Sequence, residues 1–227
     1  DTLAQLEAFA VRAAALGIDA LIHPNPVNLG YVRNFEQALR LCDGDLVFLC
    51  DQDDLWHHEK LERYAEQFAA RPDLMLLHSD ARLVDAQGQD LHCALFDAIE
   101  VTAAERDAVH AGRALDVLIR RNIGTGATRA MRRELVARAL PVEAGWIHDE
   151  WLAVAAACSG GRVDCLEWAS IDYRQHGGNQ IGAQRRSVRT KLSGAGPRRR
   201  FLASTAQRLE SLYQRCAAEG WLEPAQQ

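Results

Sequence analysis

Three aspartates follow a short apolar run in the first quarter of the chain. Asp51, Asp53 and Asp54 come directly after the run LVFLC, residues 46–50. Crowded carboxylates repel one another and are costly to remove from water, so such a cluster either faces solvent or holds something positive. Two carboxylates at a strand end can hold Mg²⁺ or Mn²⁺, together with water and phosphate oxygens. The alternative is a solvated loop in which one aspartate caps a helix beginning near Leu55.

The segments around the aspartates alternate between helical and strand patterns. Apolar residues recur at helical spacing over residues 2–16, 31–41, 55–70, 114–121, 131–140, 149–158 and 201–218. Short apolar runs predict strands at residues 18–23, 46–50, 74–85 and 162–176, the last two being one strand or a pair each. This alternation predicts an α/β fold with a mostly parallel sheet flanked by helices and a helical C-terminal extension. Ligands of such sheets bind outside the carboxyl ends of the strands, where the aspartates would lie.

Composition narrows the class of protein. The chain has 227 residues, 48% of them hydrophobic, which is enough for one substantial core and an appendage. Its net charge of −5 argues against nucleic acid as the main partner. No apolar run approaches the roughly 20 residues that a membrane-spanning helix needs. Six cysteines without a C-x-x-C pair indicate buried free thiols in a reducing, cytoplasmic setting.

The order of the motifs resembles that of family 2 glycosyltransferases of the GT-A fold, in particular the rhamnosyltransferase-like members of bacterial polysaccharide synthesis. The resemblance covers about residues 25–180. It rests on Asn28-x-Gly30-x-x-x-Asn34, then Gly44-Asp45, the apolar strand, Asp51-x-Asp53-Asp54-x-Trp56, HDEW at 148–151 and YRQHGGN at 173–179.

The resemblance implies a set of donor contacts around a divalent cation, Mn²⁺ or Mg²⁺. Asp53 would bind the metal directly, and His176 would complete its shell or contact the diphosphate. Asp51 would face the nucleotide ribose or a metal-bound water. Arg174 would neutralise phosphate, and the glycines that follow His176 would let the loop close over the donor. Without a ligand, His176 beside glycines reads as an ordinary surface residue.

A second set of residues is expected around the donor loop and the helix after residue 148. Arg33 and Asn34 would lie near the donor, although a turn and a helix start explain them equally well. Asp149 would be the general base, which accepts the proton of an acceptor hydroxyl and gives inversion; the alternative is a helix cap. Trp151 would floor the acceptor pocket or pack in the core. The NIGTGAT stretch, residues 122–128, is either a ligand-facing loop or a plain flexible one.

The implied substrates are a nucleotide-diphospho-sugar donor, with rhamnose as the expected sugar, and a glycan or lipid-linked acceptor. We expect a transferase domain over residues 1–183, followed by a basic linker and a helix over 184–227. The basic segment 185–200 would touch anionic lipid at the inner face of the membrane, or be a solvated linker. Family members begin with strands that are not recognisable here, so the sequence predicts a domain lacking its N-terminal strands.

Two other functions compete with glycosyl transfer. A metal-dependent phosphohydrolase also uses aspartates at a strand end, but it needs a downstream lysine, and Lys60 is too near in sequence while the YRQH motif stays unexplained. A noncatalytic module that binds nucleotide-sugars or glycans is favoured by the missing N-terminal strands.

Overall fold

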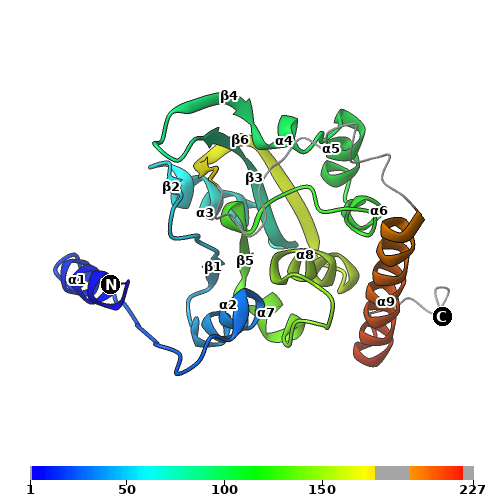
Figure 1. Ribbon diagram of the computed structural model, residues 1–227, viewed down its shortest axis with the longest axis horizontal. Coiled ribbons are helices and arrows are strands. Elements are labelled where there is room, and N and C mark those ends of the chain that lie inside the picture. Colours follow the sequence, from blue (N-terminus) through cyan, green and yellow to red (C-terminus); the bar gives the residue numbers. More distant parts are fainter. Residues whose placement is uncertain (1, 177–194, 222–227) are drawn as a thin grey trace.

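The computed structural model describes residues 2–176 and 195–221, and of residues 195–203 it describes the backbone alone. Figure 1 shows a central sheet with helices on both of its faces. The strands are β1 (Leu46–Phe48), β2 (Leu55–Trp56), β3 (Leu74–Val84), β4 (Asp90–Ala94), β5 (Ala130–Arg132) and β6 (Arg162–Arg174). The helices are α1 (Thr2–Ala14), α2 (Gly30–Leu41), α3 (Lys60–Ala70), α4 (Leu95–Ala98), α5 (Ala103–His110), α6 (Ala114–Leu118), the 3-10 turn η1 (Gly126–Thr128), α7 (Arg133–Ala139), α8 (His148–Cys158) and α9 (Ala195–Glu219).

The sheet is mixed, in the order β1-β5-β3-β6-β2, with β4 paired to β3. The long strands β3 and β6 pair in parallel and form its spine, from Leu74 opposite Arg162 to Val84 opposite Arg174. The other pairings in the described residues are antiparallel. The α/β fold with flanking helices and a C-terminal helix is therefore confirmed, whereas the expectation of a mostly parallel sheet needs correction.

The short strand β5 is one reason why the sheet is mixed. Since β1 and β3 are both antiparallel to β5, they run in the same direction, and the helix α3 that joins them is the crossover that the pattern predicted. The three-residue strand β5 lies between them and runs the other way. Strands of two or three residues are too short to show a periodicity. The sequence pattern therefore assigns β2, and residues 131–132 of β5, to the predicted helices 55–70 and 131–140.

Alternate residues of the central strands pack on opposite faces of the sheet. Leu76 and Met131 belong to the main core, which the helices α5 to α8 cover. Leu77 and Ala130 belong to a smaller cluster with Tyr64 of α3 on the other face. Trp151 is fully buried in the main core and donates from Nε1 to the carbonyl of Ala139 at 2.7 Å, so it is a packing residue and not a pocket floor.

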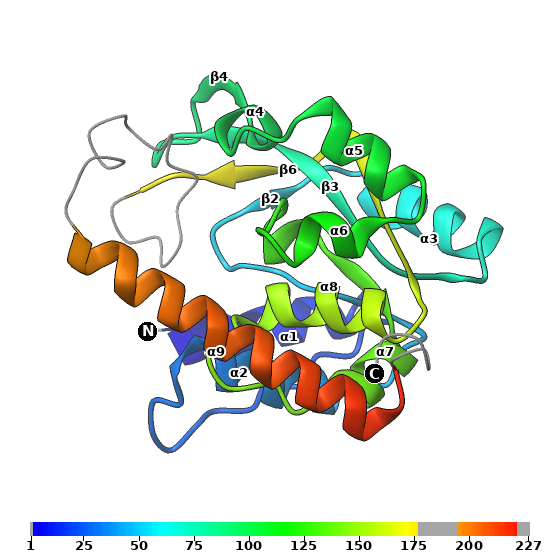
Figure 2. The ribbon, with the colours of Figure 1, turned by 90° about the vertical axis from the view of Figure 1, so that its right-hand side faces the viewer.

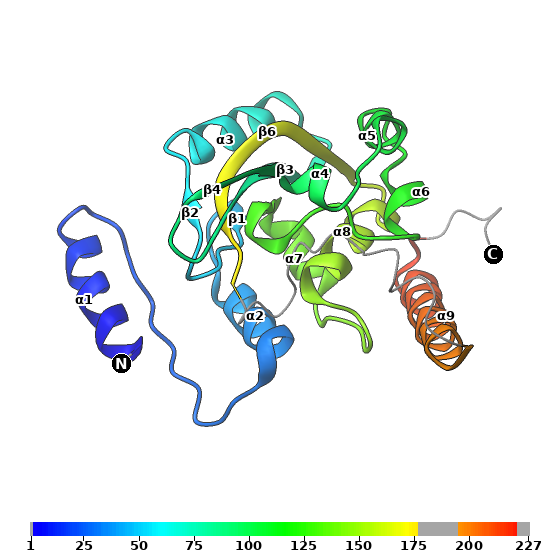
Figure 3. The ribbon, with the colours of Figure 1, turned by 45° about the horizontal axis from the view of Figure 1, so that its top comes forward.

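The N-terminal region differs from the sequence prediction. The helix predicted over residues 2–16 is present as α1, and Gly17 follows it at φ 71°, as a helix-ending glycine does. Residues 18–23 form no strand; Ile18 is 53% exposed and Leu21 is 72% exposed. No strand in the described part of the chain pairs with them, and an isolated strand has no partner for its hydrogen bonds. Figures 1 and 3 show α1 standing apart from the body and joined to α2 by an extended segment.

The C-terminal helix α9 packs on the body beside α8, as Figure 2 shows. Leu212 and Cys216 of α9 are buried in the main core. None of the helices in the described ranges is long and apolar enough to cross a membrane. The six cysteines are free thiols, but Cys42 and Cys50 are exposed and were wrongly expected to be buried. The glycines after His176, the predicted domain boundary and most of the basic segment 185–200 lie outside the described residues.

Candidate active site

The aspartates form a half-buried turn after β1, which we call the acidic turn (Asp51–Asp54). Burial raises the pKa of Asp51, and the carboxylates of Asp53 and Asp149 raise it further. Burial and the same kind of repulsion, from Asp51 and Asp53, raise the pKa of Asp54 to about 7, although the backbone N–H of Arg174 lowers it. The turn therefore concentrates negative charge where water only partly solvates it.

Residues at and just after the end of β6 contact the acidic turn and hold it in place. Arg174 donates from its backbone N–H to Asp54 Oδ1 and from Nε to the carbonyl of Asp53, both at 2.9 Å. His176 Nε2 lies 2.6 Å from Asp53 Oδ2. The structure thus brings together Asp53 and His176, the two residues expected to bind the metal. The guanidinium of Arg174 also donates to the carbonyl of Ala86 at 3.0 Å, so it braces the turn; its contact with phosphate stays a prediction.

The residues of the turn fit a hard divalent cation. Asp51 and Asp53 offer carboxylate oxygens and His176 offers an imidazole nitrogen, a set that suits Mn²⁺ or Mg²⁺. Asp54 Oδ2 is buried without a hydrogen-bond partner, and a buried carboxylate oxygen is costly unless a proton or a cation satisfies it.

Asp149 lies at the start of α8, beside the acidic turn. Asp149 is 7% exposed. Its Oδ1 accepts a hydrogen bond from the backbone N–H of Glu150 at 2.8 Å, and its Oδ2 accepts one from Asn122 Nδ2 at 3.3 Å. The carboxylate of Asp149 contributes to the raised pKa of Asp51, so the two acids share one electrostatic environment. Glu150 points instead to α9, where it pairs with Arg208 at 2.7 Å. Of the two acids in the motif, Asp149 is the one that faces the turn.

Residues 122–128, which the sequence left as either a ligand-facing or a plain loop, lie between the two acidic groups. A Cβ built on Gly126 would lie 3.4 Å from Asp149 Cβ, so the loop backbone contacts the candidate base closely. At Gly124 a Cβ would lie 2.9 Å from Nδ1 of the buried His78, so this position has no room for a side chain. Thr125 hydrogen-bonds the hydroxyl of Tyr173, whose pKa burial raises. We call this segment the bridging loop (residues 122–128).

Lys60 is the residue that sequence reasoning discounted and the structure places beneath the site. Its side chain is fully buried and Nζ donates to the carbonyl of Ala127 in the bridging loop at 2.8 Å. Nζ also lies 3.9 Å from the ring centre of Trp56. Burial lowers the pKa of Lys60 to about 8, against the opposing attraction of nearby anionic groups. Trp56 and Lys60 are four residues apart, but only tertiary packing reveals that this lysine points inward.

The two donor residues expected on α2 are engaged elsewhere in the described structure. Arg33 pairs with Glu36 at 2.5 Å and its side chain is 56% exposed. Asn34 Oδ1 accepts from Asn25 at 2.7 Å. The face of α2 that approaches the site carries Phe35, which stacks on the ring of His148 at 4.0 Å. Donor contacts by Arg33 and Asn34 therefore stay predictions.

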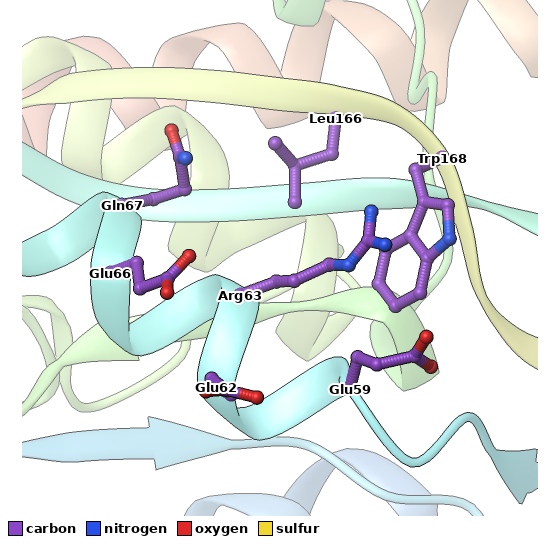
Figure 4. A pocket seen from close by; sticks show the side chains of 7 residues that line it. All are labelled: Glu59, Glu62, Arg63, Glu66, Gln67, Leu166 and Trp168. Carbon is purple, nitrogen blue, oxygen red and sulfur yellow. The ribbon is translucent and has the colours of Figure 1, made fainter.

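The described surface also has a groove and an ion-pair cluster away from the acidic turn. Figure 4 shows a groove lined by side chains of α3 together with Leu166 and Trp168 of β6. Its volume is about 500 Å³, and the Arg63 guanidinium lies 4.3 Å from the ring centre of Trp168. No predicted site residue lines it. His110, Asp164 and Cys165 could also hold a metal by proximity, but Arg71 and Arg162 already neutralise Asp164. At the acidic turn the charge is only partly offset: His176 pairs with Asp53 and the buried Lys60 lowers the pKa of Asp51 and Asp54, yet the pKa of both acids stays raised. The acidic turn is therefore the stronger candidate.

Comparison with known proteins shows the family of the chain. The sequence model described as glycosyl transferase family 2 matches residues 1–136, which include the acidic turn and the bridging loop. No curated protein sequence matches the chain. Staphylococcus aureus TarS 1–349 in complex with UDP-GlcNAc is similar in structure, with a TM-score of 0.51 and 15% identity over 79% of this chain and 48% of that one.

A second similar structure is glucosyl-3-phosphoglycerate synthase from Mycobacterium tuberculosis in complex with Mn²⁺ and UDP-glucose. Its TM-score is 0.42, with 17% identity over 91% of this chain and 63% of that one. The chain spans less than two thirds of the length of these structures. With a family match over more than half of its residues and a GT-A fold, the chain belongs to glycosyl transferase family 2.

Proposed function

We propose that the chain carries the catalytic site of an inverting glycosyltransferase, which moves a sugar from a nucleotide-diphospho-sugar to an acceptor hydroxyl. Family membership supports the reaction class. The observation that carries the proposal is that Asp149 lies beside the acidic turn and that the position packed closely against its Cβ is a glycine, Gly126. A donor diphosphate held at the turn would then present its sugar toward a carboxylate.

Asp149 acts as the general base in this proposal. Its carboxylate takes the proton of the acceptor hydroxyl while the acceptor oxygen bonds to the anomeric carbon. The bond from that carbon to the diphosphate breaks on the opposite face, and its electron pair leaves with the nucleoside diphosphate. General-base assistance of this kind is worth about 10²–10⁴-fold in rate.

Asp53 and His176 would hold the divalent cation, with Asp51 facing the ribose or a water of the cation. A bound cation would offset the negative charge of the departing diphosphate. Arg174 holds the turn in place through the Asp53 carbonyl and the Asp54 carboxylate. Rhamnose as the sugar, a glycan or lipid-linked acceptor and a location at the inner membrane face belong to the same proposal.

The test uses the full-length protein with a panel of UDP-, GDP- and dTDP-sugars, with Mn²⁺, Mg²⁺ or EDTA. Release of nucleoside diphosphate and calorimetric donor binding are measured. We expect Asp149→Asn to lower turnover at least about 100-fold and to keep donor affinity. Asp53→Ala should abolish the metal-dependent part of donor binding.

Glu150→Gln is the matched control, because it removes the neighbouring carboxylate that pairs with Arg208 and should keep most of the turnover. Full turnover in Asp149→Asn would remove the base assignment. Donor binding without any turnover in the wild type, with acceptors of several classes, would instead favour a noncatalytic binding module.

A further inference from the structure

A buried arginine lies directly beneath the start of α8. Arg129 precedes β5 and is 1% exposed. Its guanidinium donates from Nη1 to the backbone carbonyl of Asp149 and from Nη2 to Asn122 Oδ1. Burial lowers the pKa of Arg129, but a guanidinium stays protonated in proteins. A buried cation is costly unless an anion is close, so we expect an anion that pairs with this arginine.

That anion is the carboxylate of Asp149. Arg129 Nη2 lies 3.9 Å from Asp149 Oδ2, and both side chains are at most 10% exposed. Across the site Asp51 repels the same carboxylate, and Glu150 repels it from its own helix. His148, the other neighbour on α8, has its pKa lowered by burial and is neutral at pH 7. Arg129 therefore offsets two negative neighbours of Asp149.

Asn122 connects the arginine to the carboxylate, and chemistry fixes the direction of its amide. Arg129 can only donate and an ionised Asp149 can only accept, so Oδ1 of Asn122 must face the arginine and Nδ2 must face the aspartate. The backbone N–H of Gly124 also donates to Oδ1, at 3.2 Å, which agrees with this orientation.

The two oxygens of Asp149 are thereby held at separate points. Oδ1 accepts from the N–H of Glu150 and Oδ2 accepts from Asn122. Each oxygen still has a lone pair for the proton of an acceptor. Because the two donors bind two different oxygens, the arrangement fixes the plane of the carboxylate.

We propose that Asn122 and Arg129 are positioning residues for Asp149, with Arg129 orienting the Asn122 amide and Asn122 orienting the carboxylate that accepts the acceptor proton. The inference rests on the proposed function, because it assigns a role toward the general base. Neither residue touches substrate; both act through Asp149.

The test measures kcat, donor KM and calorimetric donor affinity for Asn122→Ala and Arg129→Met, using the nucleotide-sugar found by the panel. We expect each variant to lower kcat about 10–100-fold with donor KM and calorimetric donor affinity changed less than about threefold. A fall in kcat at unchanged donor affinity separates positioning of the base from a general loss of folded structure.

Arg132→Met is the matched control. Arg132 is partly buried and donates to the carbonyls of Leu74 and Phe68 on the α3 face of the sheet, away from Asp149. This control should lose stability and keep its kcat. If Arg129→Met does not fold, Asn122→Ala decides the question, with Asn122→Asp expected to be worse because it adds a third negative charge beside Asp149.

The inference is overturned if Asn122→Ala keeps the wild-type kcat while Asp149→Asn is inactive. If Asp149→Asn itself keeps full turnover, the proposed function fails first, so the two failures are distinguishable.

Discussion

Replacing Lys60 by methionine should remove a pH dependence of the free energy of unfolding that the buried ammonium imposes. Burial lowers the pKa of Lys60 from 10.5 to about 8, against the attraction of Cys50, Asp54 and Asp51. The unfolded chain solvates this amine and restores its ordinary pKa. The difference of about 2.5 in pKa corresponds to about 3 kcal/mol, at about 1.4 kcal/mol for each pKa unit.

The unfolding free energy depends on pH because the folded and unfolded chains bind the Lys60 proton differently. Between pH 8 and pH 10.5 the unfolded chain keeps a proton that the folded chain has released, so the folded state gains stability as the pH rises. The unfolding free energy of the wild type, relative to Lys60→Met, should therefore rise by about 3 kcal/mol across this window. Tyr64 and Cys165, whose pKa values burial raises to about 12, lower the stability of both proteins at high pH and cancel in the comparison.

Urea unfolding followed by tryptophan fluorescence, at intervals from pH 7 to pH 10.5, measures this difference. Arg63→Met is the control, because it removes an exposed cation from the same helix and a guanidinium keeps its proton throughout the range. A wild-type minus Lys60→Met difference that stays flat would refute the reasoning. It would mean that the ammonium reaches water and does not lie sealed between Trp56 and the Ala127 carbonyl.

Two further predictions concern stability alone. Gly161→Ala should destabilise the protein by about 1–3 kcal/mol, because a Cβ there would lie 2.3 Å from Met75 Cγ. Thermal melts compare this variant with Gly44→Ala, where the nearest atom to a Cβ is 3.6 Å away. Equal melting temperatures of the two variants would contradict the prediction. Burial raises the pKa of Glu105, but its bonds to Arg121 and the Thr102 cap outweigh this and lower it to about 2, so the folded state should lose stability as the pH falls from 4.5 toward 2. Urea unfolding at pH 7 should show Glu105→Gln about 2 kcal/mol less stable, a gap that closes in acid; a gap that persists at pH 2 would argue against this ion pair.

Long amphipathic segments were predictable from the sequence, and so were the residues of the acidic turn. The helix α2 lies within one residue of its predicted bounds, because its amphipathic pattern shows the helical period. The helix α8 is buried on nearly all sides, and its apolar, alanine-rich run predicted it without a clear period. The approach of His176 to Asp53 followed from a resemblance in motif order, not from any local pattern, since 123 positions separate the two.

The buried cations could not be predicted in the same way. Arg129, Arg132 and Arg133 lie within five positions of one another, and nothing in their types distinguishes the one that supports Asp149. That difference depends on which strand face each residue takes and on what packs against it, which a three-residue strand does not reveal. The burial of Lys60 could not be predicted either, because a lysine at a helix start is usually solvated.

The contact between Asp53 and His176 also determines when the site comes into being. Translation proceeds from the N-terminus, so the acidic turn leaves the ribosome well before the end of β6 that braces it. In the interval, neighbouring carboxylates of the nascent polypeptide have neither Arg174 nor His176 beside them. A chain truncated at residue 136 would contain everything that the family model matches and still lack Arg174 and His176, which contact the acidic turn. The proposed site therefore forms late in biosynthesis, once most of the polypeptide has emerged.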